Sequence, residues 1–117
     1  MASDRKVVKI VTSGVPHLYP DVHIYDTVLS HISDNHPEEH SRLDDIYQTI
    51  EKPDLIYQSK THNTSVILVN TSSTSASGDP LRVIVKNVSD GTALMSTAYF
   101  TSSANQGLLL WTLNDGK

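Results

Sequence analysis

The hydrophobic pattern of the chain changes its period at Pro53, and this change limits the folds that are open to it. The apolar residues before this point recur at the spacing of one helical face; they are Leu43, Ile46, Tyr47 and Ile50. After Pro53, short runs rich in β-branched and aromatic residues alternate with polar turns, which is the pattern of β-strands. We therefore predict an α+β fold, with N-terminal helices packed on a four- to five-stranded antiparallel sheet.

Two helices are expected before Pro53. The first is predicted over residues 21–36, because its apolar residues share one helical face; they are Ile24, Val28, Leu29 and Ile32. Pro37 ends this helix, since proline pushes the residue before it out of the α region and suits the first turn of a new helix. Glu38 and Glu39 then favour the positive end of the second helix dipole.

The strands are predicted from runs of β-branched residues bounded by turn residues. They are expected at 6–12, 55–57, 65–69, 82–88 and 93–101. Ser89-Asp90-Gly91 is a hairpin turn, so the two strands that it joins should be the centre of the sheet. Residues 71–78 are expected to form a polar loop or hairpin tip, and residues 108–113 either an edge strand or a packed tail.

Length and composition indicate a single globular domain over residues 1–117. The chain has no cysteine, which excludes disulfides and thiolate zinc sites and fits a reducing compartment. No apolar run approaches the roughly 20 residues that cross a bilayer, so we expect a cytoplasmic protein without a membrane partner. The net charge of −4 argues against tight nonspecific binding of nucleic acid.

Histidines are concentrated around the predicted break between the helices. His31 and His36 are candidates for acid–base catalysis, because histidine changes its charge near neutral pH. The alternative is that His31 packs between helices and His36 is a surface group. A metal site is disfavoured, since Pro37 breaks the helical register between His36 and His40. We therefore predict no metal and no other cofactor.

A second candidate group is Thr97 and Tyr99, which alternation places on one face of a central strand together with Met95. Their hydroxyls are candidate donors to a phosphate or to a leaving group. The alternative is that both are strand-forming residues that pack in the core.

A third candidate group consists of the cations that flank the strands, Lys60, Arg82 and Lys86. An arginine can hold a phosphate with two donors at once, so these residues are candidate phosphate-binding groups. The alternative is that they are solvated surface residues or guards of edge strands.

Several short motifs occur together in a fixed order along the chain: His31-Ile32, His36-Pro37-Glu38, Pro53-Asp54, Leu81 to Val85 and Thr97-Ala98-Tyr99. In this combination the chain resembles the phage and prophage members of the barnase, EndoU, colicin and RelE-like nuclease superfamily. The resemblance runs from about residue 24 to residue 111.

The resemblance implies a metal-independent endoribonuclease, of toxin or phage type, with helices followed by an antiparallel sheet. It implies catalytic roles for His31, His36, Thr97 and Tyr99, and a phosphate-facing role for Arg82 or Lys86. A general base would activate the ribose 2′-OH for attack on the phosphate, and a general acid would protonate the leaving group. The expected partners are RNA and an inhibitor or immunity-type protein.

A different class of function stays open at this point. The same fold could be a noncatalytic binding or assembly module that packs against a protein partner through its helices. The acidic segment Asp34 to Asp54 would suit a basic partner of this kind.

Overall fold

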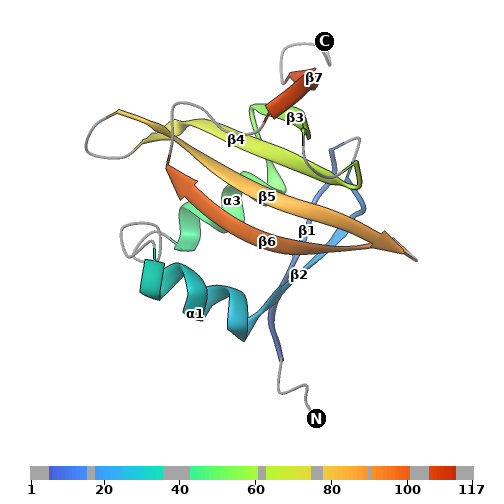
Figure 1. Cartoon of the computed structure of the whole chain (residues 1–117). Coiled ribbons are helices and arrows are strands. Elements are labelled where there is room, and N and C mark those ends of the chain that lie inside the picture. The colour runs from blue at the N-terminus through green and yellow to red at the C-terminus, as the bar shows by residue number, and fades with distance from the viewer. Residues whose placement is uncertain are drawn as a thin grey trace.

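The computed structural model describes residues 6–15, 18–35, 43–60, 63–74, 78–89, 91–100 and 106–112. These residues form two helices and seven strands (Figure 1). In chain order they are β1 (Val7–Thr12), β2 (Asp21–Tyr25), α1 (Asp26–Asn35), α3 (Leu43–Glu51), β3 (Leu55–Ser59), β4 (Ser65–Thr74), β5 (Pro80–Ser89), β6 (Thr92–Phe100) and β7 (Gln106–Thr112).

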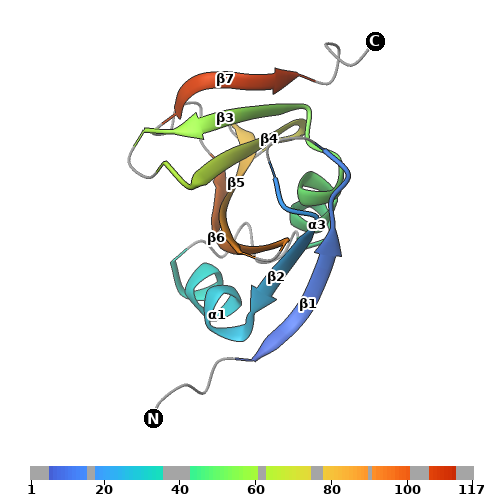
Figure 2. The same cartoon turned by 90° about the vertical axis from the view of Figure 1, so that its right-hand side faces the viewer.

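The seven strands form one sheet in the order β1-β2-β6-β5-β4-β3-β7. Neighbouring strands are antiparallel, except that β2 pairs with β6 in parallel. The sheet curves around α3, which contacts β1, β4 and β5, and α1 lies against β6 and β2 (Figure 2). The predicted central pair, β5 and β6, is confirmed by this strand order.

The predicted fold class is wrong. The sheet of the described residues is mixed rather than antiparallel and has seven strands rather than four or five. Two strands account for the difference: β2, which replaces the start of the predicted first helix and pairs in parallel with β6, and the edge strand β7, which pairs with β3. Residues 106–112 therefore follow the edge-strand alternative, not the packed tail.

The predicted first helix is wrong in its first five residues, which form β2. Val22 and Ile24 are fully buried and alternate with more exposed residues, the period of a strand with one face in the core. The apolar residues from Ile24 onward have helical spacing, but the alternation of Val22 and Ile24 also fits a strand. Pairing with β1 and β6 makes residues 21–25 a strand. The helix itself begins at Asp26 and ends at Asn35. The predicted first turn of the second helix lies outside the described residues.

The core lies between the sheet and the two helices. Ile32 of α1 and Ile46 and Ile50 of α3 are fully buried in one cluster with strand residues, among them Leu81 and Val83. Burying a large aliphatic side chain contributes about 1.5–3 kcal/mol. In the described part of the chain, neither helix has the length and apolar character needed to pass through a bilayer.

An irregularity in β6 changes which residues share a face. Thr97 pairs with Ile84, whereas the next pair joins Met95 to Val85, so Ser96 is an extra residue, a β-bulge. Met95 is therefore buried in the core together with Ala98. The prediction that Met95 shares a face with Thr97 and Tyr99 is wrong, because the bulge shifts the alternation by one residue.

Candidate functional site

One face of strands β3 to β6 points away from α3, and we call it the outer face. On β5, Leu81, Val83 and Val85 belong to the core, so the residues that alternate with them lie on the opposite side. Strand pairing extends this side across the neighbouring strands. The residues that define the outer face are Tyr57, Ile67, Val69, Arg82, Ile84, Lys86, Leu94, Thr97 and Tyr99.

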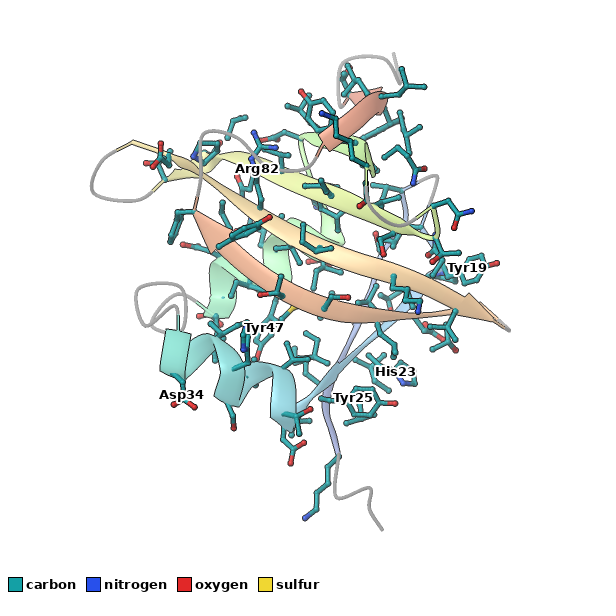
Figure 3. All side chains as sticks on the ribbon, viewed as in Figure 1. Tyr19, His23, Tyr25, Asp34, Tyr47 and Arg82 are labelled. Atoms are coloured by element: carbon teal, nitrogen blue, oxygen red, sulfur yellow. The ribbon has the colours of Figure 1, made fainter. Side chains whose placement is uncertain are left out.

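Arg82 is the most unusual residue of the outer face, because only 6% of it is exposed to solvent. Its guanidinium carbon lies 5.9 Å from the centre of the Tyr57 ring, within the range of a cation–π interaction. Tyr99 is its cross-strand partner on β6. Figure 3 shows Arg82 on β5, towards the start of the strand. Strands β3, β5 and β6 thus place a cation between two tyrosines.

Thr97 lies on the same face, opposite Ile84 and two residues before Tyr99. Its hydroxyl oxygen is buried and has no hydrogen-bond partner among the residues that the structure describes. Thr49 of α3 shows the usual arrangement: its hydroxyl donates to the carbonyl oxygen of Asp45 at 2.7 Å and accepts from the side-chain amide of Asn70 at 3.1 Å. An unsatisfied buried hydroxyl costs about 1–3 kcal/mol, so Thr97 is available to a ligand at a cost to stability.

Together, these residues can bind an oxyanion. A guanidinium carries five N–H donors in a fixed fork that matches the oxygens of a phosphate. Its low exposure strengthens the attraction to an anion, because water screens the charge less. The Thr97 hydroxyl adds a donor on the same face. Of the predicted site residues, the structure therefore brings together Arg82, Thr97 and Tyr99.

The two predicted lysines lie elsewhere. Lys86 is exposed on the outer face, four residues after Arg82 on β5. Lys60 is also exposed and follows β3, at the end of the sheet where Lys86 lies. Neither lysine joins the cluster of Arg82, Thr97 and Tyr99.

The predicted catalytic histidines have different outcomes. His31 is exposed on α1, a helix that packs on the core side of β6, whereas Thr97 and Tyr99 are on the other side of that strand. His36 and His40 lie outside the described residues. Among the residues that the structure describes, no group of three or more His, Asp or Glu side chains could hold a metal ion.

The Pro53-Asp54 part of the motif is structural. One carboxylate oxygen of Asp54 accepts hydrogen bonds from the backbone N–H and the hydroxyl of Thr71, both at 2.8 Å. The backbone N–H of Asp54 donates to the carbonyl of Val69. Asp54 thus holds the start of β3 against β4, and it does not contact the outer-face cluster through these bonds.

Tyr57 was missed in the sequence analysis as a site residue. It falls in a predicted strand whose three residues, Leu55, Ile56 and Tyr57, are all apolar or aromatic, so residue type alone does not show which face Tyr57 is on. The signal that could have found it is alternation: its neighbour Ile56 is fully buried, which leaves Tyr57 on the other face.

An open pocket of about 240 Å³ lies at the edge of the sheet, between β1 and α3. Its lining includes Lys9, Tyr47 and Glu51, and the Lys9 ammonium lies 5.0 Å from the centre of the Tyr47 ring. Burial, and secondarily the charge of Asp44, raises the pKa of Tyr47 above its usual value of 10.0. This pocket contains none of the predicted site residues.

Comparison of the chain with protein-family models, with curated proteins and with solved structures finds no match.

Proposed function

We propose that the protein is a metal-independent endoribonuclease whose outer face binds the phosphate of RNA at Arg82. The observation that carries this proposal is the almost fully buried guanidinium beside a buried threonine hydroxyl that has no partner. Leaving a hydroxyl unsatisfied costs stability, and a ligand with anionic oxygens would supply the partner that the Thr97 hydroxyl lacks among the described residues, close to the positive charge of Arg82.

The chemistry follows from the groups on and beside this face. Arg82 would hold the scissile phosphate and stabilise the negative charge that grows on its oxygens in the transition state. Thr97 and Tyr99 would donate to the same oxygens or position them. The 2′-oxygen attacks the phosphorus, the bond to the 5′-oxygen breaks, and the product carries a 2′,3′-cyclic phosphate. His31 and His36 stay the candidates from the sequence for the base and the acid, although α1 packs on the core side of the sheet and so carries His31 on the side opposite Arg82.

The test is cleavage of a fluorescent single-stranded RNA in the presence of EDTA. We expect the wild-type protein to cleave it and to leave a 2′,3′-cyclic phosphate end. His31→Ala and His36→Ala should each lower kcat by about 10²–10⁴-fold, the range that a general acid or base contributes. Arg82→Lys should lower kcat/KM by at least tenfold, because an ammonium cannot form the two-donor fork.

The matched control is Lys52→Gln, which removes an exposed positive charge just after α3, outside the outer face. This variant should cleave as the wild type does. A wild-type protein that does not cleave RNA would contradict the proposal. Cleavage that EDTA abolishes would contradict the metal-independent mechanism.

A noncatalytic assembly module is the second candidate function, and β7 favours it. This edge strand carries no charged residue, and Leu108 and Leu109 are 77% and 49% exposed. Uncharged edge strands with exposed apolar side chains are templates for pairing with a strand of another protein. Light scattering would detect self-assembly, and Leu108→Lys should abolish it while leaving RNA cleavage unchanged.

A further inference from the structure

The pocket between β1 and α3 is lined by two side chains of opposite charge. Lys9 lies on β1, an outermost strand of the sheet, and Glu51 is the last residue of α3. Both side chains are exposed, and among the described residues neither forms an ion pair. The pocket therefore presents a cation and an anion that do not neutralise each other by direct contact.

The fold sets the spacing of these two charges. Helix α3 packs against β1 (Figure 2), and the Lys9 ammonium lies 5.0 Å from the centre of the Tyr47 ring. Glu51 is four residues after Tyr47, so both side chains share one face of the helix. Four helical residues rise about 6 Å, which places the carboxylate roughly that far along the helix from the ammonium. One small ligand that carries both charges can bridge such a gap.

The size and the remaining walls of the pocket narrow the ligand further. Val11 is a core residue and the Tyr47 ring is half-buried, so both offer apolar surface. The volume of about 240 Å³ equals that of about eight water molecules at roughly 30 Å³ each, which is the size of a single amino acid. Glu51 disfavours a purely anionic ligand, and Lys9 disfavours a purely cationic one.

We infer that this pocket binds a free α-amino acid with an apolar side chain. The ligand carboxylate contacts the Lys9 ammonium, and the ligand ammonium contacts the Glu51 carboxylate. The apolar side chain of the ligand lies against Tyr47 and Val11. The inference does not depend on the proposed function, because none of these residues belongs to the outer face.

The test is an NMR titration of the isotopically labelled protein with L-leucine, which carries both charges and an aliphatic side chain. We expect saturable shift changes at the backbone amides of residues 9–12, Tyr47 and Glu51, with a Kd on the order of 1 mM. The analogues 4-methylpentanoate and 3-methylbutylamine each lack one charge of leucine. Each should bind about tenfold more weakly, because it loses a charge-assisted hydrogen bond.

Lys9→Gln and Glu51→Gln should each weaken leucine binding by about tenfold for the same reason. The matched controls are Lys52→Gln and Asp44→Asn, which remove one charge of the same sign from exposed positions outside the pocket lining. Both controls should bind leucine as the wild type does. All four positions are exposed, so the thermal unfolding temperature should change little in any variant.

Three results would each overturn the inference. They are a leucine titration without saturable shift changes, an analogue that binds as tightly as leucine, and wild-type affinity in Lys9→Gln or Glu51→Gln. Leucine binding with the expected variant effects, by a protein that cleaves no RNA, would uphold the inference and overturn only the proposed function.

Discussion

Comparison of Thr97 with Thr49 distinguishes a hydroxyl that we assign to ligand binding from one that stabilises the fold. Both have buried hydroxyls, but only the Thr49 hydroxyl is satisfied, by Asp45 and Asn70. A polar group without a partner lowers the stability of the folded chain. Its presence beside Arg82 is understandable if a ligand supplies the missing partner.

This difference predicts opposite effects of the same substitution. Thr97→Val should raise the free energy of unfolding by about 1 kcal/mol, because it removes an unsatisfied hydroxyl. It should also weaken binding of RNA. Thr49→Val should lower the free energy of unfolding by about 1–2 kcal/mol, because it breaks two hydrogen bonds. Urea denaturation measures both, and equal losses of stability in the two variants would contradict our interpretation of Thr97.

Sequence reasoning reached Arg82, Thr97 and Tyr99 individually, through their residue types and the motif. It could not establish that Arg82 is buried, because local sequence does not show what packs over a side chain. It assigned Pro53-Asp54 to the same motif without identifying the hydrogen bonds from Thr71, which join residues 17 positions apart.

Strand β6 shows, at the scale of an element, why alternation alone misplaced a residue. A bulge changes the face of every residue beyond it. The residues Met95-Ser96-Thr97 include no glycine or other sequence signal that would predict a bulge. Bulges are frequent beside functional sites, where they redirect side chains. The bulge at Ser96 directs Thr97 and Tyr99 to the outer face while Met95 stays in the core.

The bulge predicts that β6 tolerates a deletion. Removing Ser96 leaves the pairs of Thr97 with Ile84 and of Met95 with Val85 intact, so no side chain changes its face. Deleting Ile67 from the regular part of β4 would turn one half of that strand inside out. We expect the Ser96 deletion to unfold cooperatively in urea and the Ile67 deletion to fail to fold. A Ser96 deletion that does not fold would show that the bulge itself is required.

The packing of α3 gives a prediction about pH. Burial raises the pKa of Tyr47 in the folded protein above its usual value of 10.0. The unfolded chain therefore loses this proton first as the pH rises. The stabilisation is complete below pH 10 and is lost as the pH passes through the raised pKa of the folded state.

Tyr47→Phe removes this dependence, so its free energy of unfolding should fall less between pH 9 and pH 11.5 than that of the wild type. Tyr19→Phe, which changes an exposed tyrosine, is the matched control. Urea denaturation across this pH range measures the difference. Identical pH profiles for Tyr47→Phe and the wild type would mean that the folded environment of Tyr47 does not affect its ionisation.

At the scale of the whole molecule, the sheet joins segments that are far apart in the sequence. The parallel pair of β2 and β6 aligns Val22 with Ala93. Sequence periodicity reports which face of an element is apolar, but it does not report which strands are neighbours. The change of period at Pro53 therefore indicated helices before most of the strands, while β2 and its pairing with β1 and β6 could not be predicted.

In this architecture the two sides of the sheet differ in the residues that they carry. The side that faces α3 holds the core, and the outer face of β3 to β6 holds Arg82, Lys86 and the tyrosines. A rigid strand scaffold fixes these side chains relative to one another, which is what a preorganised anion site requires.

The most direct measurement is an NMR titration of the isotopically labelled protein with a 2′-fluoro oligoribonucleotide. We predict that the shift changes concentrate at the backbone amides of Tyr57, Arg82, Ile84, Thr97 and Tyr99, and that Arg82→Gln abolishes them. Shift changes confined to β7 or to the pocket between β1 and α3, or no changes at all, would contradict an RNA-binding outer face.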